Sequence, residues 1–204
     1  MKLKQLEMAL QRLEGFSNPD AALEQYVTPA PLAARLLFHA AMKGDIGGKA
    51  ICDLGSGTGI LAIGAALLGA VDVVGVEIDA HAAGVARANA DLIDVDVDFI
   101  VADIREPEVC SSIGKKDTVV MNPPFGAQNV HADRPFIDCA LAAAPVIYGI
   151  FNAGSCQFIQ TYTAGKATIS ETVGTKLSLR RTFSFHTRDV LEIGVEILRL
   201  TRNP

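Results

Sequence analysis

Short apolar runs alternate with longer segments through the central part of the chain. Runs of small and β-branched apolar residues, typical of strands buried on both faces, occupy residues 50–54, 71–76, 97–101, 117–121 and 146–151. The segments 60–68 and 80–92 between them are long enough for helices. This alternation predicts an α/β fold with a parallel sheet, whose site lies at the carboxyl ends of the strands.

The N-terminal pattern is helical and then extended. Apolar residues recur at helical spacing over 3–14, and Gly15 is a suitable stop. An extended stretch then leads into a predicted helix over 32–42. Thr28 has the side chain of an N-cap, with Pro29 just inside the helix.

The C-terminal part of the chain predicts a different arrangement. A helix is expected around 155–165, followed by two alternating strands over 176–185 and 190–200. A turn joins these strands, so they predict an antiparallel hairpin at one edge of the sheet.

A glycine-rich turn, Asp53-Leu-Gly-Ser-Gly-Thr-Gly59, follows the first strand. Gly55, Gly57 and Gly59 let the backbone approach a ligand, and the helix that follows offers free N–H groups. These features predict a nucleotide-like ligand. The dinucleotide fingerprint spaces its glycines differently, and Asp53 would repel a pyrophosphate but suits the ammonium of a methionine moiety. The alternative is an ordinary tight turn.

Acidic residues end the next two strands. Glu77 lies 24 residues after Asp53, where such folds place a carboxylate on the ribose, and Ile78 beside it is expected at the same site. Asp103 could accept from the exocyclic amine of an adenine, with Ile104 packing on the ring. The alternative for Asp103 is a cap of the following helix.

The tetrapeptide Asn122-Pro-Pro-Phe125 follows the fourth strand. Pro123 and Pro124 stiffen the loop and remove two amide donors, which leaves carbonyl oxygens as its polar groups. The side-chain oxygen of Asn122 and the carbonyl of Pro123 could each accept one hydrogen of an –NH2 group. Phe125 offers a flat face for a base. The loop therefore predicts catalysis on a planar amine, the alternative being a stiff surface turn.

Together these motifs resemble those of class I S-adenosylmethionine-dependent methyltransferases. The tetrapeptide is typical of members that methylate adenine N6, guanine N2, cytosine N4 or a release-factor glutamine. A longer resemblance, to the methyltransferase-like protein 5 family of ribosomal RNA N6-adenine methyltransferases and its archaeal relatives, rests on the segments Gln25-Tyr-x-Thr28, Asp53–Leu61, Gly75–Asp79, Asp117–Gly126 and Ala132-Asp-x-x-Phe136.

The resemblance implies one Rossmann-like methyltransferase domain over 1–204, with a helical cap over the cofactor site at 1–45 and a catalytic core at 46–204. It implies a seven-stranded, mostly parallel sheet with a C-terminal antiparallel hairpin and helices on both faces. Gln25, Tyr26 and Thr28 would help to close a pocket for S-adenosyl-L-methionine, which leaves as S-adenosyl-L-homocysteine.

The resemblance also implies partners. The substrate would be an adenine of small-subunit ribosomal RNA, and a small zinc-containing activator protein would bind the enzyme. The third strand lacks the lysines or proline that normally protect a sheet edge, so residues 95–103 are expected to dock this activator or a second copy of the chain. One departure is the segment 148–154, where a family-typical basic contact to substrate is missing.

Charge and cysteine content limit the other possibilities. The net charge of −5 argues against a protein that grips nucleic acid with its whole surface. Residues 1–163 carry a net −8 and residues 164–204 a net +3. The four cysteines lack zinc spacing, so we expect reduced thiols, no metal and a cytoplasmic protein without membrane segments. The basic C-terminal segment, a possible nucleic-acid contact, contains Lys166, Lys176, Arg180, Arg181, His186 and Arg188.

The same residues leave three other functions open. The same chemistry could act on guanine N2 or on a protein glutamine. A non-catalytic cofactor-binding module in ribosome assembly could use the loop only to hold RNA. A dehydrogenase is disfavoured by Asp53 and by the glycine spacing.

Overall fold

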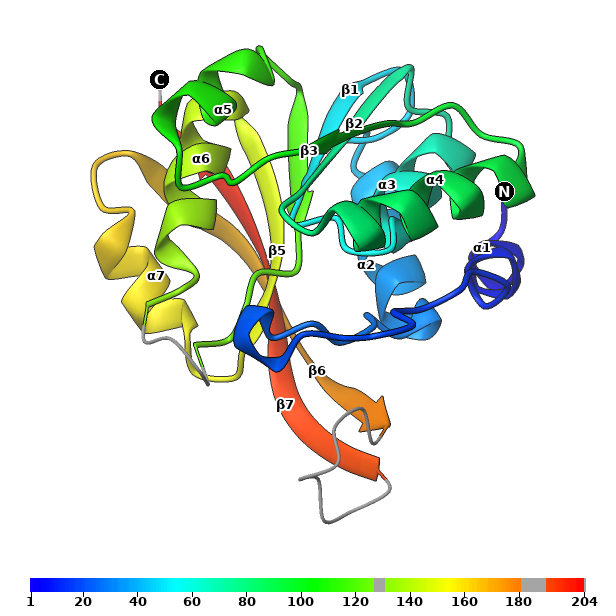
Figure 1. The fold of residues 1–204 in the computed structure, drawn as a ribbon. Helices are drawn as coiled ribbons and strands as arrows, with labels where there is room; N and C mark the ends of the chain where they lie inside the picture. Colours follow the sequence, from blue (N-terminus) through cyan, green and yellow to red (C-terminus); the bar gives the residue numbers. More distant parts are fainter. Residues whose placement is uncertain (127–130, 181–189, 204) are drawn as a thin grey trace.

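The fold is built on one mixed sheet (Figure 1). The computed structural model describes residues 1–126, 131–180 and 190–203. Its seven strands have the order β3-β2-β1-β4-β5-β7-β6. β1 to β5 run parallel, whereas β7 pairs antiparallel with both β5 and β6. The predicted parallel sheet with a C-terminal antiparallel hairpin is therefore confirmed. The strand bounds are Ala50–Leu54 (β1), Asp72–Glu77 (β2), Asp98–Val101 (β3), Thr118–Met121 (β4), Val146–Asn152 (β5), Ala167–Arg180 (β6) and Val190–Arg202 (β7).

Helices cover both faces of the sheet (Figure 1). Alternate strand residues point to opposite faces, so Ile51 packs in one apolar core and Cys52 in the other. The first face carries α1 (Leu3–Leu10), α2 (Ala30–Met42), α3 (Ile60–Leu67) and α4 (Ala80–Ile93). The second face carries α5 (Pro107–Ser112), α6 (Arg134–Ala143) and α7 (Cys156–Tyr162).

The chain reverses its direction across the sheet at β1. It runs outward from β1 through β2 to β3, and it then returns to place β4 on the other side of β1. Such a switch point separates the loops that follow the two neighbouring strands and opens a crevice at their carboxyl ends. The glycine turn after β1 and the Asn-Pro-Pro-Phe loop after β4 lie on the two sides of this crevice.

Several predicted elements differ from the structure. Pro29, not Thr28, is the N-cap of α2, because the helix begins at Ala30; the Thr28 hydroxyl instead accepts a hydrogen bond from Asn122. β6 begins at Ala167, well before the predicted residue 176. Its first half is largely polar, as suits an edge strand with a solvated face, and it therefore lacks the apolar run on which the prediction relied. Part of the predicted hairpin, with Arg181, His186 and Arg188, lies outside the described residues.

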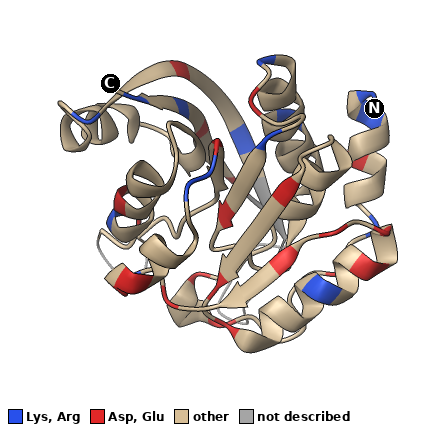
Figure 2. Cartoon of the chain, turned by 90° about the horizontal axis from the view of Figure 1, so that it is seen from above, with Lys and Arg blue, Asp and Glu red and all other residues tan. Residues whose placement is uncertain are grey.

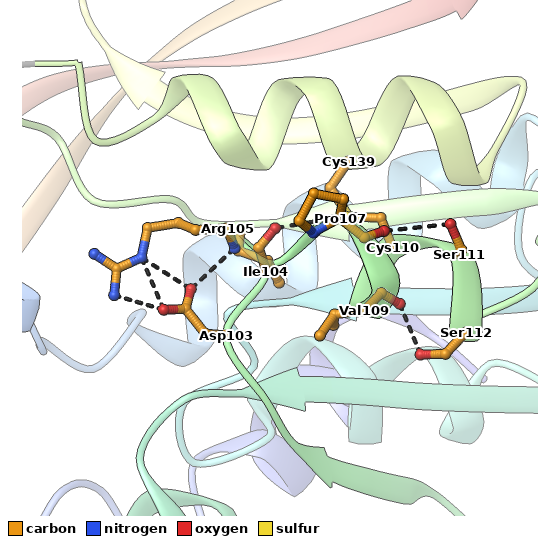
Figure 3. Close-up of a disulfide and its surroundings, with 9 residues drawn as sticks. All are labelled: Asp103, Ile104, Arg105, Pro107, Val109, Cys110, Ser111, Ser112 and Cys139. Carbon is orange, nitrogen blue, oxygen red and sulfur yellow. Dashed lines mark hydrogen bonds and ion pairs between the residues drawn. A yellow bond between two sulfur atoms is a disulfide. The ribbon is translucent and has the colours of Figure 1, made fainter.

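The expectation of four reduced cysteines is wrong for one pair. Cys110 of α5 and Cys139 of α6, both drawn in Figure 3, form a disulfide with their Cα atoms 5.4 Å apart. Cys52 and Cys156 are free. The two partners lie 29 residues apart in the sequence, and only the packing of α5 on α6 brings them together.

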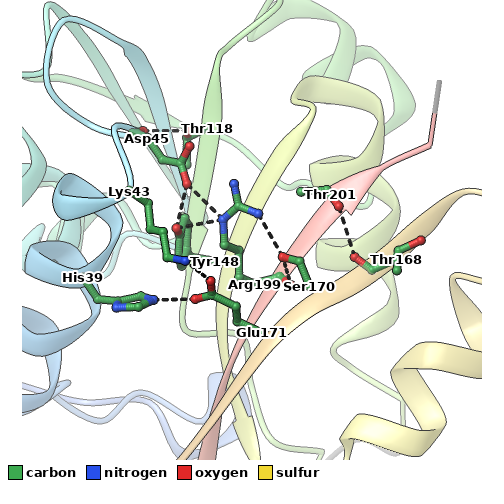
Figure 4. A network of polar contacts seen from close by, with 10 residues as sticks. All are labelled: His39, Lys43, Asp45, Thr118, Tyr148, Thr168, Ser170, Glu171, Arg199 and Thr201. Atoms are coloured by element: carbon green, nitrogen blue, oxygen red, sulfur yellow. Dashed lines mark hydrogen bonds and ion pairs between the residues drawn. The ribbon is translucent and has the colours of Figure 1, made fainter.

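A polar network ties the hairpin to the first helical layer (Figure 4). Asp45, after α2, accepts hydrogen bonds from the Tyr148 hydroxyl at 2.7 Å and from Nε of Arg199 at 3.0 Å. Tyr148 is fully buried, and burial together with the Asp45 carboxylate raises the pKa of its hydroxyl. His39 of α2 and Lys43, the C-cap of that helix, both pair with Glu171 of β6. Tyr148, the first residue of the segment 148–154, thus has a structural role.

Candidate active site

A cavity of about 300 Å³ lies at the carboxyl ends of β1 to β4. We refer to it as the strand-end cavity. The segment that precedes α2 covers it on one side, and the start of α6 borders it on another. Its lining includes Phe16, Ala22–Thr28, Asp53, Gly55–Thr58, Ile60, Leu61, Val76–Ile78, Ala102–Arg105, Asn122, Pro124, Ala132, Pro135 and Phe136.

The glycine turn forms the floor of the cavity between two phenyl rings. Gly55 and Gly57 have left-handed φ angles of +68° and +54°. A Cβ on Gly55 would lie 2.7 Å from Cε1 of Phe136, and one on Gly57 would lie 2.9 Å from Cζ of Phe16. Side chains at these two positions are therefore excluded on steric grounds as well as by conformation. Gly59 does not line the cavity; as the N-cap of α3 it lets the helix pack against Phe99.

Glu77 is fixed by the backbone around it. Its Oε2 accepts from the Gly57 N–H at 2.7 Å, and its Oε1 accepts from the Asp79 N–H at 2.9 Å. The side chain is only 6% exposed, and desolvation raises the pKa of its carboxyl despite these two donors. Carboxylate oxygens have further lone pairs, so Glu77 can still accept from a hydroxyl pair in the cavity.

Asp53 is more deeply buried, with 1% of its surface exposed. Its Oδ2 accepts from the Ala62 N–H at 2.9 Å, whereas Oδ1 has no partner. Burial raises the pKa of this carboxyl to about 7, with a smaller contribution from the charge of Glu77. A buried carboxyl with one unpaired oxygen at the edge of a cavity is suited to pair with a cation there.

Asp103 is already paired with a neighbour. Arg105 donates from Nε to Oδ1 at 2.9 Å and from Nη2 to Oδ2 at 2.6 Å (Figure 3). This hydrogen-bonded guanidinium lowers the pKa of the Asp103 carboxyl. The Arg105 N–H also donates to Oδ1, so the turn is held from backbone and side chain together. Asp103, Ile104 and Arg105 all line the cavity.

Asn122, directly after β4, lines the cavity. Its Nδ2 donates to Oγ1 of Thr28 at 2.8 Å, and its Oδ1 is buried without a partner. Pro124 also lines the cavity, but Pro123 is buried outside the lining. Phe125 is not a lining residue either; its ring packs on Tyr26 with centroids 5.3 Å apart.

The N-terminal segment covers the cavity with residues 16 and 22–28 only. Gln25 anchors it, because its Nε2 donates to Oδ2 of Asp79 at 2.9 Å and its Oε1 accepts from the Asp20 N–H. The Tyr26 hydroxyl is buried without a partner, and desolvation raises its pKa. Helices α1 and α2 instead pack with α3 in the first core, through fully buried residues such as Leu6 and Leu37.

Sequence reasoning missed several lining residues. Ser56 has a buried hydroxyl without a partner, and Phe16 and Phe136 flank the glycine turn. Phe136 belongs to a motif that carried the family resemblance, which was a usable signal, whereas nothing in the sequence marked Phe16. Within the described part of the chain, no three His, Cys, Asp or Glu side chains converge as metal ligands. Nor is any helix there long and apolar enough to cross a membrane.

The fold, the strand-end cavity and the Asn-Pro-Pro-Phe loop together define a Rossmann-like methyltransferase. Residues 34–123 match the family described as Ribosomal protein L11 methyltransferase (PrmA). The chain is 35% identical to rRNA N(6)-adenosine-methyltransferase METTL5 of Danio rerio, over 98% of this chain and 99% of the other. It therefore belongs to the METTL5 family.

Two archaeal proteins are similar over the full length. An uncharacterized protein of Methanocaldococcus jannaschii is 39% identical, over 99% of this chain and 95% of its own. The crystal structure of a candidate RNA methyltransferase from Pyrococcus horikoshii superposes with a TM-score of 0.91 at 37% identity, covering 100% of this chain and 99% of that one.

Proposed function

We propose that this protein transfers the methyl group of S-adenosyl-L-methionine to N6 of an adenosine in ribosomal RNA, in the small subunit. Membership of the METTL5 family supports the reaction class. The observation that carries the proposal is the Asn122 amide: its Nδ2 is held by Thr28, and its Oδ1 is buried in the cavity wall without a partner.

The cavity residues fit the cofactor. Glu77, with both oxygens held in place by backbone N–H groups, suits the two ribose hydroxyls, and the unpaired Oδ1 of Asp53 suits the methionine ammonium. Ala102 and Ile104 offer apolar contacts for the adenine, next to the Asp103 carboxylate. The cofactor supplies an electrophilic methyl group on a sulfonium.

Asn122 would position and polarise the acceptor amine. The nitrogen of an exocyclic amine is a poor nucleophile because its lone pair is delocalised into the ring. A fixed carbonyl oxygen that accepts one of its hydrogens stabilises the positive charge that grows as the nitrogen becomes tetrahedral. The proton can leave after transfer, so no strong base is required.

The charge distribution suits contact with RNA close to the cavity and not over the whole protein surface. Lys and Arg do not gather on one element in the described part of the chain (Figure 2). With a net charge of −5, affinity from phosphate contacts alone is expected to be low. Recognition would then depend on contacts close to the cavity and on any partner protein.

The test is methyl transfer by the purified protein. Small and large ribosomal subunits from cells that lack the gene are incubated in separate reactions with the purified protein and labelled cofactor. The modified nucleoside is identified by mass spectrometry. We expect N6-methyladenosine in the small subunit. Label confined to protein, or N2-methylguanosine as the product, would contradict the proposal. Asn122→Ala should bind S-adenosyl-L-homocysteine with nearly unchanged affinity and transfer no methyl, which separates catalysis from a purely binding role.

The edge strand β3 would dock a partner in the cytoplasm. In the strand order β3 lies at the edge, where among the described strands it pairs only with β2, and Ile100 and Val101 are 38% and 45% exposed. An exposed apolar edge favours strand addition by a small zinc-containing activator protein, or by a second copy of the chain. Hydrogen exchange tests this: the β3 amides should gain protection when the activator is added, and unchanged exchange would refute the docking surface.

A further inference from the structure

Outside the strand-end cavity, three rings lie nearly parallel between the start of α6 and α7. The centroids of His131 and Phe158 are 6.4 Å apart with an interplanar angle of 22°, and those of Phe158 and Tyr162 are 5.7 Å apart with an angle of 27°. The guanidinium carbon of Arg134 lies 5.5 Å from the Phe158 centroid and 5.4 Å from that of Tyr162. We refer to these four residues as the ring stack.

The ring stack adjoins the catalytic loop. Arg134 is the first residue of α6, and its neighbours Pro135 and Phe136 line the strand-end cavity. Asn152, at the end of β5, donates from Nδ2 to the Phe125 carbonyl at 3.3 Å and so joins the approach to α7 to the Asn-Pro-Pro-Phe loop. Figure 1 shows α6 and α7 on the same side of the sheet.

The stack is accessible and held in place. His131 is exposed, and Arg134, Phe158 and Tyr162 are half-buried, whereas Ile159 beside Phe158 is fully buried in the core. The Tyr162 hydroxyl donates to Oδ2 of Asp138 at 2.7 Å, which fixes the orientation of that ring. The Nε of Arg134 is buried without a hydrogen-bond partner, so packing of the protein alone does not satisfy this donor.

Aromatic and guanidinium planes in this arrangement are suited to nucleobases. Single-stranded RNA is recognised largely by stacking of splayed bases on aromatic rings and on Arg planes. Stacking attracts the base and not the phosphates, so it can contribute to binding by a chain of net charge −5. A base that stacks beside the catalytic loop would belong to a nucleotide next to the one being methylated.

We propose that the ring stack binds the base of a nucleotide that flanks the target adenosine in a single-stranded RNA substrate. This inference rests on the proposed function, because it assigns a second contact to the same substrate. It predicts that Phe158 acts on RNA affinity and not on cofactor binding or on the chemical step.

The kinetic test compares two substitutions of Phe158. Phe158→Leu removes the ring but keeps an apolar side chain, and we expect it to raise KM for RNA about 5-fold or more, the range measured for loss of one stacked base. The kcat at saturating RNA, the affinity for S-adenosyl-L-homocysteine and the melting temperature should stay near wild type. Phe158→Tyr keeps the ring and should restore KM. A Leu variant with unchanged KM would overturn the proposal.

A binding test works without turnover. The chain contains no tryptophan, so Phe158→Trp places a single tryptophan, which can be excited selectively, in the stack. Gln160→Trp places one on an exposed position of the same helix as a matched control. Titration with single-stranded oligoadenylate should quench the first and not the second, and an abasic oligomer should quench neither. Equal quenching of both, or of neither, would refute the stack as a base site. If the wild type transfers no methyl to RNA but the quenching is seen, only the proposed function fails.

Discussion

The Asn122 side-chain amide donates to the Thr28 hydroxyl across 94 positions of sequence, at 2.8 Å. This bond engages the NH2 group of Asn122 and leaves its buried Oδ1 as the polar atom without a partner. An acceptor at that place can bind an amine hydrogen, whereas a donor would repel it. The segment before α2 therefore sets which polar group of Asn122 is left unpaired, as well as covering the cavity.

Thr28→Val should lower kcat while the fold is retained. The valine has the same shape but cannot accept from Nδ2, so the Asn122 amide loses its fixed orientation. Loss of one such bond corresponds to about a 5- to 10-fold decrease in kcat. Steady-state kinetics at saturating cofactor would measure it. Thr28→Ser keeps the hydroxyl and should stay within error of wild type, and a fully active valine variant would contradict the orienting role.

Asp53 should make the ligand-free protein less stable as the pH rises. Burial raises its folded-state pKa to about 7, above the value near 3.8 expected for an exposed carboxyl. The folded state therefore favours the protonated form, and this advantage is complete below about pH 4 and lost as the pH rises through 7. Thermal melts of wild type and Asp53→Asn from pH 5 to pH 8 would test this.

The wild type should lose stability over that interval relative to Asp53→Asn, by a few kcal/mol. The Asn oxygen can still accept from the Ala62 N–H, so the variant removes the titration and keeps the bond. Parallel melting curves for the two proteins would show that Asp53 does not titrate in this range.

Gly55→Ala should weaken cofactor binding beyond its effect on stability. The left-handed backbone at Gly55 disfavours a Cβ by about 1 kcal/mol, and the Cβ would also displace the Phe136 ring from the cavity wall. Gly44 has a similar φ of +80°, and a Cβ added there would meet no atom within 4 Å. Gly44→Ala therefore measures the conformational cost of a left-handed alanine without a steric clash. Urea unfolding should show a comparable backbone contribution to the loss of stability in the two variants. Calorimetric titration of S-adenosyl-L-homocysteine should show weaker binding only for Gly55→Ala.

Removal of the disulfide should lower stability. The cross-link between Cys110 and Cys139 encloses a loop of 29 residues, and loss of such a link typically reduces the free energy of unfolding by about 2–4 kcal/mol. The double variant Cys110→Ser, Cys139→Ser should therefore melt lower than wild type, and reductant should bring the wild type down to the same temperature. Cys156→Ser, at a free cysteine, is the control. A wild type that is insensitive to reductant would argue against the bond in solution.

The sequence by itself determined the parts of the site that depend on local patterns. The glycine turn requires left-handed φ angles at Gly55 and Gly57, and the alternation of apolar runs places Glu77 and Asn122 at strand ends. These residues lie where they were expected because strand, turn and helix each follow from neighbouring residues. The alternation also indicated the parallel core and the edge position of the third strand.

Only the tertiary structure decided the contacts that join distant segments. It revealed the bond from Asn122 to Thr28, the two phenyl rings of Phe16 and Phe136 around the glycine turn, and the Cys110–Cys139 disulfide. It also turned Phe125 toward Tyr26 and away from the cavity lining. A local pattern records which backbone conformation a segment adopts, but the distance between two segments is set by how helices pack on the sheet, and that depends on the whole core at once.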